Sequence, residues 1–134
     1  MSHNDVRRAR CSCGQLRVDV RGEPLRVSVC HCLACQQRTG SAFGYQARFT
    51  RDQVNIMGVA TEYIRIADSG NRMHCHFCPQ CGATVHYYLS SAPDIVVIPA
   101  GAFADPQFYA PKFSVYESRR HSWVSIDSDA EHAD

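Results

Sequence analysis

Residues 11–40, CSCGQLRVDVRGEPLRVSVCHCLACQQRTG, contain two short groups of cysteines separated by two apolar runs. In the runs 15–20 and 25–29, apolar and polar residues alternate, which predicts two half-buried strands. The RGEP segment between them is typical of a turn. We therefore expect an antiparallel hairpin whose open end brings Cys13 close to Cys30.

The rest of the chain continues as short apolar runs separated by Gly, Pro, Asp and Ser. We expect further strands at 44–49, 61–66, 73–77, 84–89, 95–100 and 112–116, and helical turns only at 33–38 and 104–109. This pattern predicts a mainly β domain of short antiparallel strands. The 134 residues suffice for one domain. We place it at 11–126, between an N-terminal extension (1–10) and a frayed, disordered tail (127–134).

Charge and composition exclude several classes of protein. The 14 Lys and Arg are spread along the chain and the net charge is +1, so we expect no binding to nucleic acid. The N-terminus carries arginines without an apolar run behind them, so we expect neither a secretory signal nor a membrane anchor. The expected location is the cytoplasm, and exposed strand edges would allow a homodimer.

The eight cysteines lie in three groups. They are Cys11-x-Cys13, Cys30-x-Cys32-x2-Cys35 and Cys75-x2-Cys78-x2-Cys81. In a reducing compartment, clustered thiols bind metal or perform redox chemistry more often than they form disulfides. The grouping therefore predicts metal binding.

Four of these cysteines fit a structural zinc site. Such a site takes four ligands, usually as two close pairs on separate loops. CSCG (11–14) and CPQCG (78–82) each place glycine after the last sulfur, where a positive φ lets the backbone turn and direct amide groups at a thiolate. We predict one closed site formed by Cys11, Cys13, Cys78 and Cys81.

The middle group differs because it offers three thiolates and no closing glycine. Three protein ligands and one open position are typical of a catalytic zinc, so we predict this role for Cys30, Cys32 and Cys35. His31 should point to the other face of an extended segment, which favours a surface or supporting role over ligation. Cys75 is either a buried thiol that packs as a small hydrophobe, which we favour, or a fourth ligand that would close this site.

The motifs CSCG, CHCLACQQRTGSAF and FCPQCG, in this order, resemble the glutathione-dependent formaldehyde-activating enzyme family, which includes centromere protein V. The resemblance runs from Cys11 to the segment VYESRRHSWVSID (115–127). It implies a β-tent fold organised around two zinc ions. It implies the same structural ligands (Cys11, Cys13, Cys78, Cys81) and catalytic ligands (Cys30, Cys32, Cys35), whereas Cys75 has no counterpart in the family pattern.

The reaction that the resemblance implies is the addition of glutathione to formaldehyde to give S-hydroxymethylglutathione, an activity of the carbon-sulfur lyase class. Zinc favours the thiolate form of a bound thiol and holds it beside the aldehyde. Carboxylates of glutathione need a cation, for which Arg38 is the nearest candidate. Thr39, Gly40 and Ser41 could donate hydrogen bonds at the pocket mouth, or form an ordinary polar turn.

Other functions remain open at this point. One alternative is a non-enzymatic interaction module in which both metals are structural. A zinc-ribbon nucleic-acid binder is disfavoured by the balanced charge, and a C-x2-C redox protein by the absence of a βαβ pattern. The aromatic residues Phe43, Tyr45, Tyr63, Phe77 and Trp123 are predicted in the core.

Overall fold

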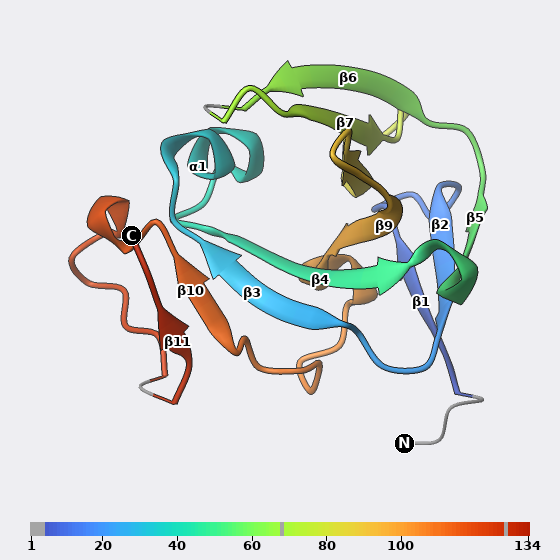
Figure 1. The fold of residues 1–134 in the computed structure, drawn as a ribbon. Helices are drawn as coiled ribbons and strands as arrows, with labels where there is room; N and C mark the ends of the chain where they lie inside the picture. Colours follow the sequence, from blue (N-terminus) through green and yellow to red (C-terminus); the bar gives the residue numbers. More distant parts are fainter. Residues whose placement is uncertain (1–4, 68, 128) are drawn as a thin grey trace.

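The computed structural model describes residues 5–67, 69–127 and 129–134 (Figure 1). Most of the elements in these ranges are short strands, which confirms the mainly β class. In chain order they are β1 (Val6–Arg10), β2 (Arg17–Arg21), β3 (Arg26–Cys30), α1 (Leu33–Thr39), β4 (Gly44–Thr50), η1 (Arg51–Gln53), β5 (Val54–Met57), β6 (Thr61–Ile66), β7 (Arg72–Phe77), β8 (Thr84–Leu89), β9 (Ala92–Pro99), η2 (Ala100–Phe103), β10 (Phe113–Val115), η3 (Glu117–Arg119) and β11 (Glu131–His132).

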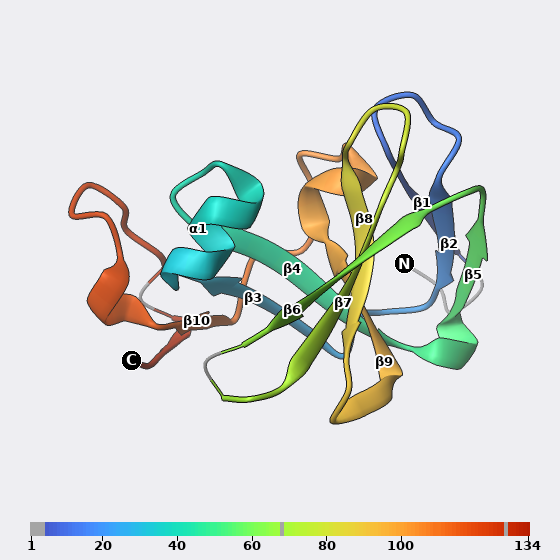
Figure 2. The same ribbon diagram turned by 90° about the horizontal axis from the view of Figure 1, so that it is seen from above.

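The strands form two sheets. The small sheet has the order β1-β2-β5, and the large sheet has the order β11-β10-β3-β4-β9-β8-β7-β6. All pairings are antiparallel except those of β10, which runs parallel to both β3 and β11. In Figure 1 α1 lies between β3 and the β6–β7 end of the large sheet, and Figure 2 shows it beside β3 and β4. This arrangement agrees with the predicted β-tent fold.

The predicted hairpin of the first two apolar runs is wrong. The strand β2 pairs with β1 and β5, whereas β3 pairs with β4 and β10, so the RGEP segment carries the chain from one sheet to the other. Alternation predicts which side chains face a core, but it does not specify which strand lies alongside. The edges of β2 are taken by β1 and β5, which were not expected because their sequences VRRAR and VNIM are short and lack a clear alternation.

The main core lies between the two sheets. Its fully buried side chains come from β2 and the residue before it and from β4, β8 and β9, and include Leu16, Val18, Val20, Phe49, Val85, Val96 and Ile98. Each large apolar side chain contributes about 1.5–3 kcal/mol by leaving water. Because Cys11 and Cys78 belong to the same buried cluster, one group of cysteines sits at the edge of this core.

The ends of the chain contribute more structure than expected. Residues 6–10, predicted as part of an extension, pair with β2 along their whole length. In the predicted tail, β11 lies parallel to β10, and the amide of Glu131 donates to the carbonyl of Lys112 (2.9 Å). Residues 1–4 and 128 lie outside the described residues. Over the part of the chain that is described, no helix is both long and apolar enough to span a membrane.

Candidate metal centre

Two groups of cysteines have sulfur atoms within 4.8 Å of one another, close enough to share a metal ion. The first comprises Cys11, Cys13, Cys78 and Cys81, and the second comprises Cys30, Cys32 and Cys35. These are the two sets that the sequence motifs predicted. Among the described residues, Cys75 belongs to neither set.

The four-cysteine cluster joins the two sheets. Cys11 and Cys13 lie in the β1–β2 turn, and Cys78 and Cys81 lie in the β7–β8 loop. The sulfur of Cys13 is 3.6 Å from those of both Cys11 and Cys78. A disulfide would need about 2.05 Å, whereas four thiolates around zinc at about 2.3 Å lie about 3.8 Å apart. The spacing therefore fits a tetrahedral metal site.

Amide groups surround the sulfur atoms of this cluster. The side-chain amide of Gln15 donates to Cys78 Sγ (2.9 Å), the backbone amide of Gln80 donates to the same sulfur (3.4 Å), and that of Leu16 donates to Cys11 Sγ (3.3 Å). Burial by itself would raise the pKa of Cys78, but the amide donors, with Gln15 first, lower it to about 6. The chain thus stabilises a thiolate, the form that binds metal.

The glycines after the last sulfurs have the predicted conformation. Gly14 and Gly82 have φ of +84° and +82°. Their amides donate to the carbonyls of Cys11 (3.0 Å) and Cys78 (2.8 Å), which closes each loop around its sulfurs. An L side chain rarely adopts such a φ, so glycine is the residue that each turn requires.

The three-cysteine cluster is formed where β3 meets α1. Cys30 ends β3, Cys32 caps the helix and accepts a hydrogen bond from the Cys35 amide (3.3 Å), and Cys35 lies in the first helical turn. The Cys30 thiol donates to Cys35, and with Cys32 and the Arg38 guanidinium it lowers the pKa of Cys35 to about 5 despite burial. The same hydrogen bond raises the pKa of Cys30. Three sulfurs at this spacing fit a metal with three protein ligands.

A pocket of about 470 Å³ lies between α1 and the β6–β8 end of the large sheet. Its lining residues come from α1, β6, β7 and the start of β8, and are Ala34, Gln37, Arg38, Tyr63, Arg65, Cys75, Phe77, Gly82 and Thr84. None of the clustered cysteines lines it. Because Arg38 and Cys35 share one helix, the pocket nevertheless adjoins the three-cysteine cluster. Two arginines suit it to an anion.

Only one of the four predicted substrate-binding residues, Arg38, lines this pocket. The hydroxyl of Thr39 donates to the carbonyl of Cys35 (2.9 Å) and accepts from the amide of Ser41 (3.1 Å). Gly40 ends the helix. The bonds of these three residues are those of a polar turn, one of the two interpretations that the sequence allowed.

Some pocket residues were missed or misplaced. Tyr63 and Phe77, predicted in the core, line the pocket, and Tyr63 is 61% exposed. Trp123 is likewise on the surface, 76% exposed. These pocket residues could have been predicted from the register of β6 and β7, which sets Tyr63 opposite Cys75. This register places both residues, with Arg65, on one face of the sheet. That register cannot be known from either segment alone.

Cys75 has the surroundings of a buried thiol. It is 6% exposed and packs in a small apolar cluster with Met73, Tyr87 and Val97. Burial raises its pKa, which disfavours the thiolate that a metal would need.

Comparisons with known proteins identify a family and a similar fold. Residues 6–119 match the family described as glutathione-dependent formaldehyde-activating enzyme. A crystal structure of a Rhodobacter sphaeroides protein has a similar fold, with a TM-score of 0.55 and 20% sequence identity over 71% of this chain and 85% of that chain. No curated protein matches this sequence. The residues from 120 onward lie beyond the family match.

Proposed function

Because the chain belongs to the glutathione-dependent formaldehyde-activating enzyme family, we propose that it is an enzyme that adds glutathione to formaldehyde. In this reaction a carbon–sulfur bond forms, and the thiol proton ends on the former carbonyl oxygen. No oxidant or reductant is needed. The observation that supports this proposal is the inequality of the two clusters, since one has four cysteines and the other has three.

The four-cysteine cluster would hold a structural zinc, and Cys30, Cys32 and Cys35 would hold a catalytic one. Thiolate ligands favour zinc over hard cations such as magnesium and calcium. When bound by three protein ligands, zinc has a fourth position that favours a thiolate and polarises an aldehyde. With Cys75 in neither cluster, that position has no competing cysteine among the described residues.

The pocket would bind the thiol substrate. Glutathione carries two carboxylates, and the guanidinium groups of Arg38 and Arg65 offer charge-assisted hydrogen bonds to them. The Arg38 guanidinium lies 5.3 Å from the centre of the Tyr87 ring, which restrains it beside the helix. Binding there would hold the substrate sulfur near the three-cysteine cluster and so replace a chance encounter by a fixed geometry.

Two serine variants test this assignment. In Cys32→Ser we expect a folded protein that has lost the acceleration of S-hydroxymethylglutathione formation and binds the second zinc weakly. In Cys81→Ser we expect a large loss of thermal stability, because this sulfur joins the two sheets. Exchange NMR of glutathione with formaldehyde measures the rate above the spontaneous reaction, and elemental analysis measures zinc. Full activity in Cys32→Ser, or the same loss of stability in both variants, would contradict the catalytic role.

A further inference from the structure

The C-terminal part of the chain holds the backbone of the three-cysteine cluster. The strand β10 pairs in parallel with β3, which sets Val115 opposite Cys30. The next amide, that of His31, donates to the carbonyl of Val115 (3.0 Å). The backbone at Cys30 and His31 is thus held by β10, a strand about eighty positions later in the chain.

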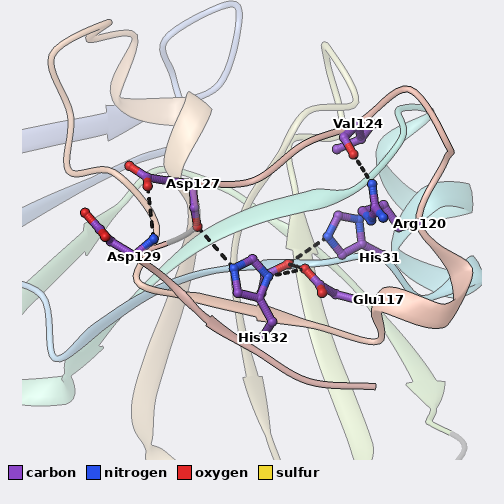
Figure 3. Close-up of polar contacts among 8 residues, drawn as sticks. His31, Glu117, Arg120, Val124, Asp127, Asp129 and His132 are labelled. Atoms are coloured by element: carbon purple, nitrogen blue, oxygen red, sulfur yellow. Dashed lines mark hydrogen bonds and ion pairs between the residues drawn. The ribbon is translucent and has the colours of Figure 1, made fainter.

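A chain of side-chain hydrogen bonds continues this contact. The His31 ring meets the Ser114 hydroxyl through Nε2 (2.9 Å), and that hydroxyl donates to the Glu117 carboxylate (2.6 Å) (Figure 3). A serine has one hydroxyl hydrogen, so His31 Nε2 must be the donor in the first bond. Both His31 and Ser114 are fully buried. The imidazole between two predicted ligands therefore has one orientation and one tautomer.

Glu117 is itself held by the end of the chain. Its carboxylate accepts from His132 Nδ1 (2.6 Å), while His132 Nε2 donates to the carbonyl of Asp127 (3.1 Å) (Figure 3). The amide of Ala133 donates to the carbonyl of Ser114 (2.9 Å), and the amide of Glu117 donates to that of Ala133 (3.0 Å). We call the linked residues His31, Ser114, Glu117 and His132 the C-terminal latch.

A second tether joins the same segment to α1. The side chain of Gln36 donates to the carbonyls of His31 (2.9 Å) and Arg119 (3.1 Å), and its oxygen lies 2.9 Å from His121 Nε2. Gln36 directly follows the third cysteine of the cluster. Both sides of the metal-binding turn are therefore attached to residues near or beyond the end of the family match.

We propose that Glu117, acting through Ser114 and His31, is a positioning residue that keeps Cys30 and Cys32 at ligand spacing. This inference rests on the proposed function, because it requires a metal at the three-cysteine cluster. Groups that orient metal ligands typically change metal affinity by about 10- to 100-fold when they are removed. Without the carboxylate, the Ser114 hydroxyl and then the His31 ring lose their orientation, and the turn that carries the sulfurs loosens.

The test compares zinc release from the two clusters of the full-length chain. Zinc-loaded protein is mixed with an excess of a colorimetric chelator, and Cys32→Ser identifies the phase that belongs to the three-cysteine cluster. In Glu117→Gln and Ser114→Ala we expect that phase to be faster by about 10- to 100-fold, with the four-cysteine phase unchanged. Glu131→Gln, which removes an exposed carboxylate next to the latch, is the matched control and should change neither phase.

Cobalt-loaded protein gives a second readout, because cobalt bound by thiolates has characteristic absorption bands. In Glu117→Gln we expect the bands of the cobalt in the three-cysteine cluster to shift and those of the other cobalt to stay unchanged. An equal effect on both release phases would mean general destabilisation and would overturn the proposal. Unchanged release in Glu117→Gln would overturn it as well, because this variant removes the charge of the latch carboxylate, a side chain that is 22% exposed. If wild-type protein binds one metal, the proposed function fails together with the latch. If it binds two and the variants behave as wild type, only the latch fails.

Discussion

Arg38 and Arg65 approach the pocket from opposite walls, one on α1 and one on β6. A terminal nitrogen of Arg65 lies 3.2 Å from the sulfur of Met73, and both arginines line the pocket. A guanidinium group favours a planar acceptor such as a carboxylate. The positive charge of the pocket therefore comes from two arginines that are 27 positions apart in the sequence.

We expect Arg65→Gln to raise the KM for glutathione about 10-fold or more and to leave kcat nearly unchanged, because a charge-assisted hydrogen bond contributes about 1.5–3 kcal/mol to binding. Initial rates at varied glutathione concentration measure both constants. Arg72→Gln removes an exposed arginine of β7 that does not line the pocket, and it serves as the control. An unchanged KM in Arg65→Gln would contradict the placement of the substrate.

For Cys75→Ala we expect two zinc ions per chain, as in the wild type, because the sulfur packs among apolar side chains and lies in neither cluster. The variant should lose about 1 kcal/mol of stability through the small cavity that it leaves. Elemental analysis and thermal unfolding measure the two quantities. Loss of one zinc would show that Cys75 is a ligand and would close the proposed open position.

At the scale of elements, β11 shows how a strand of two residues can form. Its two residues bury no apolar side chain. The strand is instead held by backbone hydrogen bonds to β10 and by the ion pair of His132 with Glu117. The hydrogen bond to Glu117 raises the pKa of His132, and bonds from Ser114 and His132 lower the pKa of Glu117. The nearby Arg120 opposes the charge on His132, and its own guanidinium donates to the carbonyl of Val124 (Figure 3).

Stability should therefore depend on pH through this pair. A raised pKa means that the contribution of His132 is complete below about pH 6.5 and is lost as pH rises through the raised value. The lowered pKa of Glu117 means that its contribution is lost only as pH falls through that lowered value. We expect wild type to have a higher Tm than His132→Gln, measured by calorimetry. The difference should be largest at about pH 5.5 and should vanish at alkaline pH. A difference that does not change with pH, or one that persists in a Glu117→Gln background, would contradict this account.

At the scale of the whole molecule, the four-cysteine cluster lies where the two sheets meet. Its sulfurs come in pairs from the β1–β2 turn and the β7–β8 loop, and two of them are part of the main core. A metal bound here restrains the small sheet against the large one. Metal binding to the folded state alone adds directly to the free energy of unfolding.

We expect removal of zinc by a strong chelator under reducing conditions to lower the free energy of unfolding by several kcal/mol, on the order of the stability of a small domain. Denaturant titration with and without chelator measures this loss. Cys32→Ser should show nearly the same loss as the wild type, because the second cluster joins β3 to the adjacent α1 and no separate sheets. Equal stability with and without metal would contradict the structural role.

The sequence by itself determined the class of the fold, the two cysteine sets and the glycine turns behind the sulfurs. These features depend on local patterns: alternation sets which side chains face inward, and short spacing sets which sulfurs can share a metal. The strands at 61–66 and 84–89 were predicted with their observed bounds for the same reason.

Only the tertiary structure decided which strands pair, which arginines face the pocket and what holds the three-cysteine turn. The hairpin predicted from the first two apolar runs is absent because β1 and β5 take the edges of β2. Arg65 joins Arg38, and Glu117 reaches His31 through Ser114, by contacts between segments far apart in the chain. Such contacts depend on register and packing, which follow from the balance of all the interactions and are not encoded in any one segment.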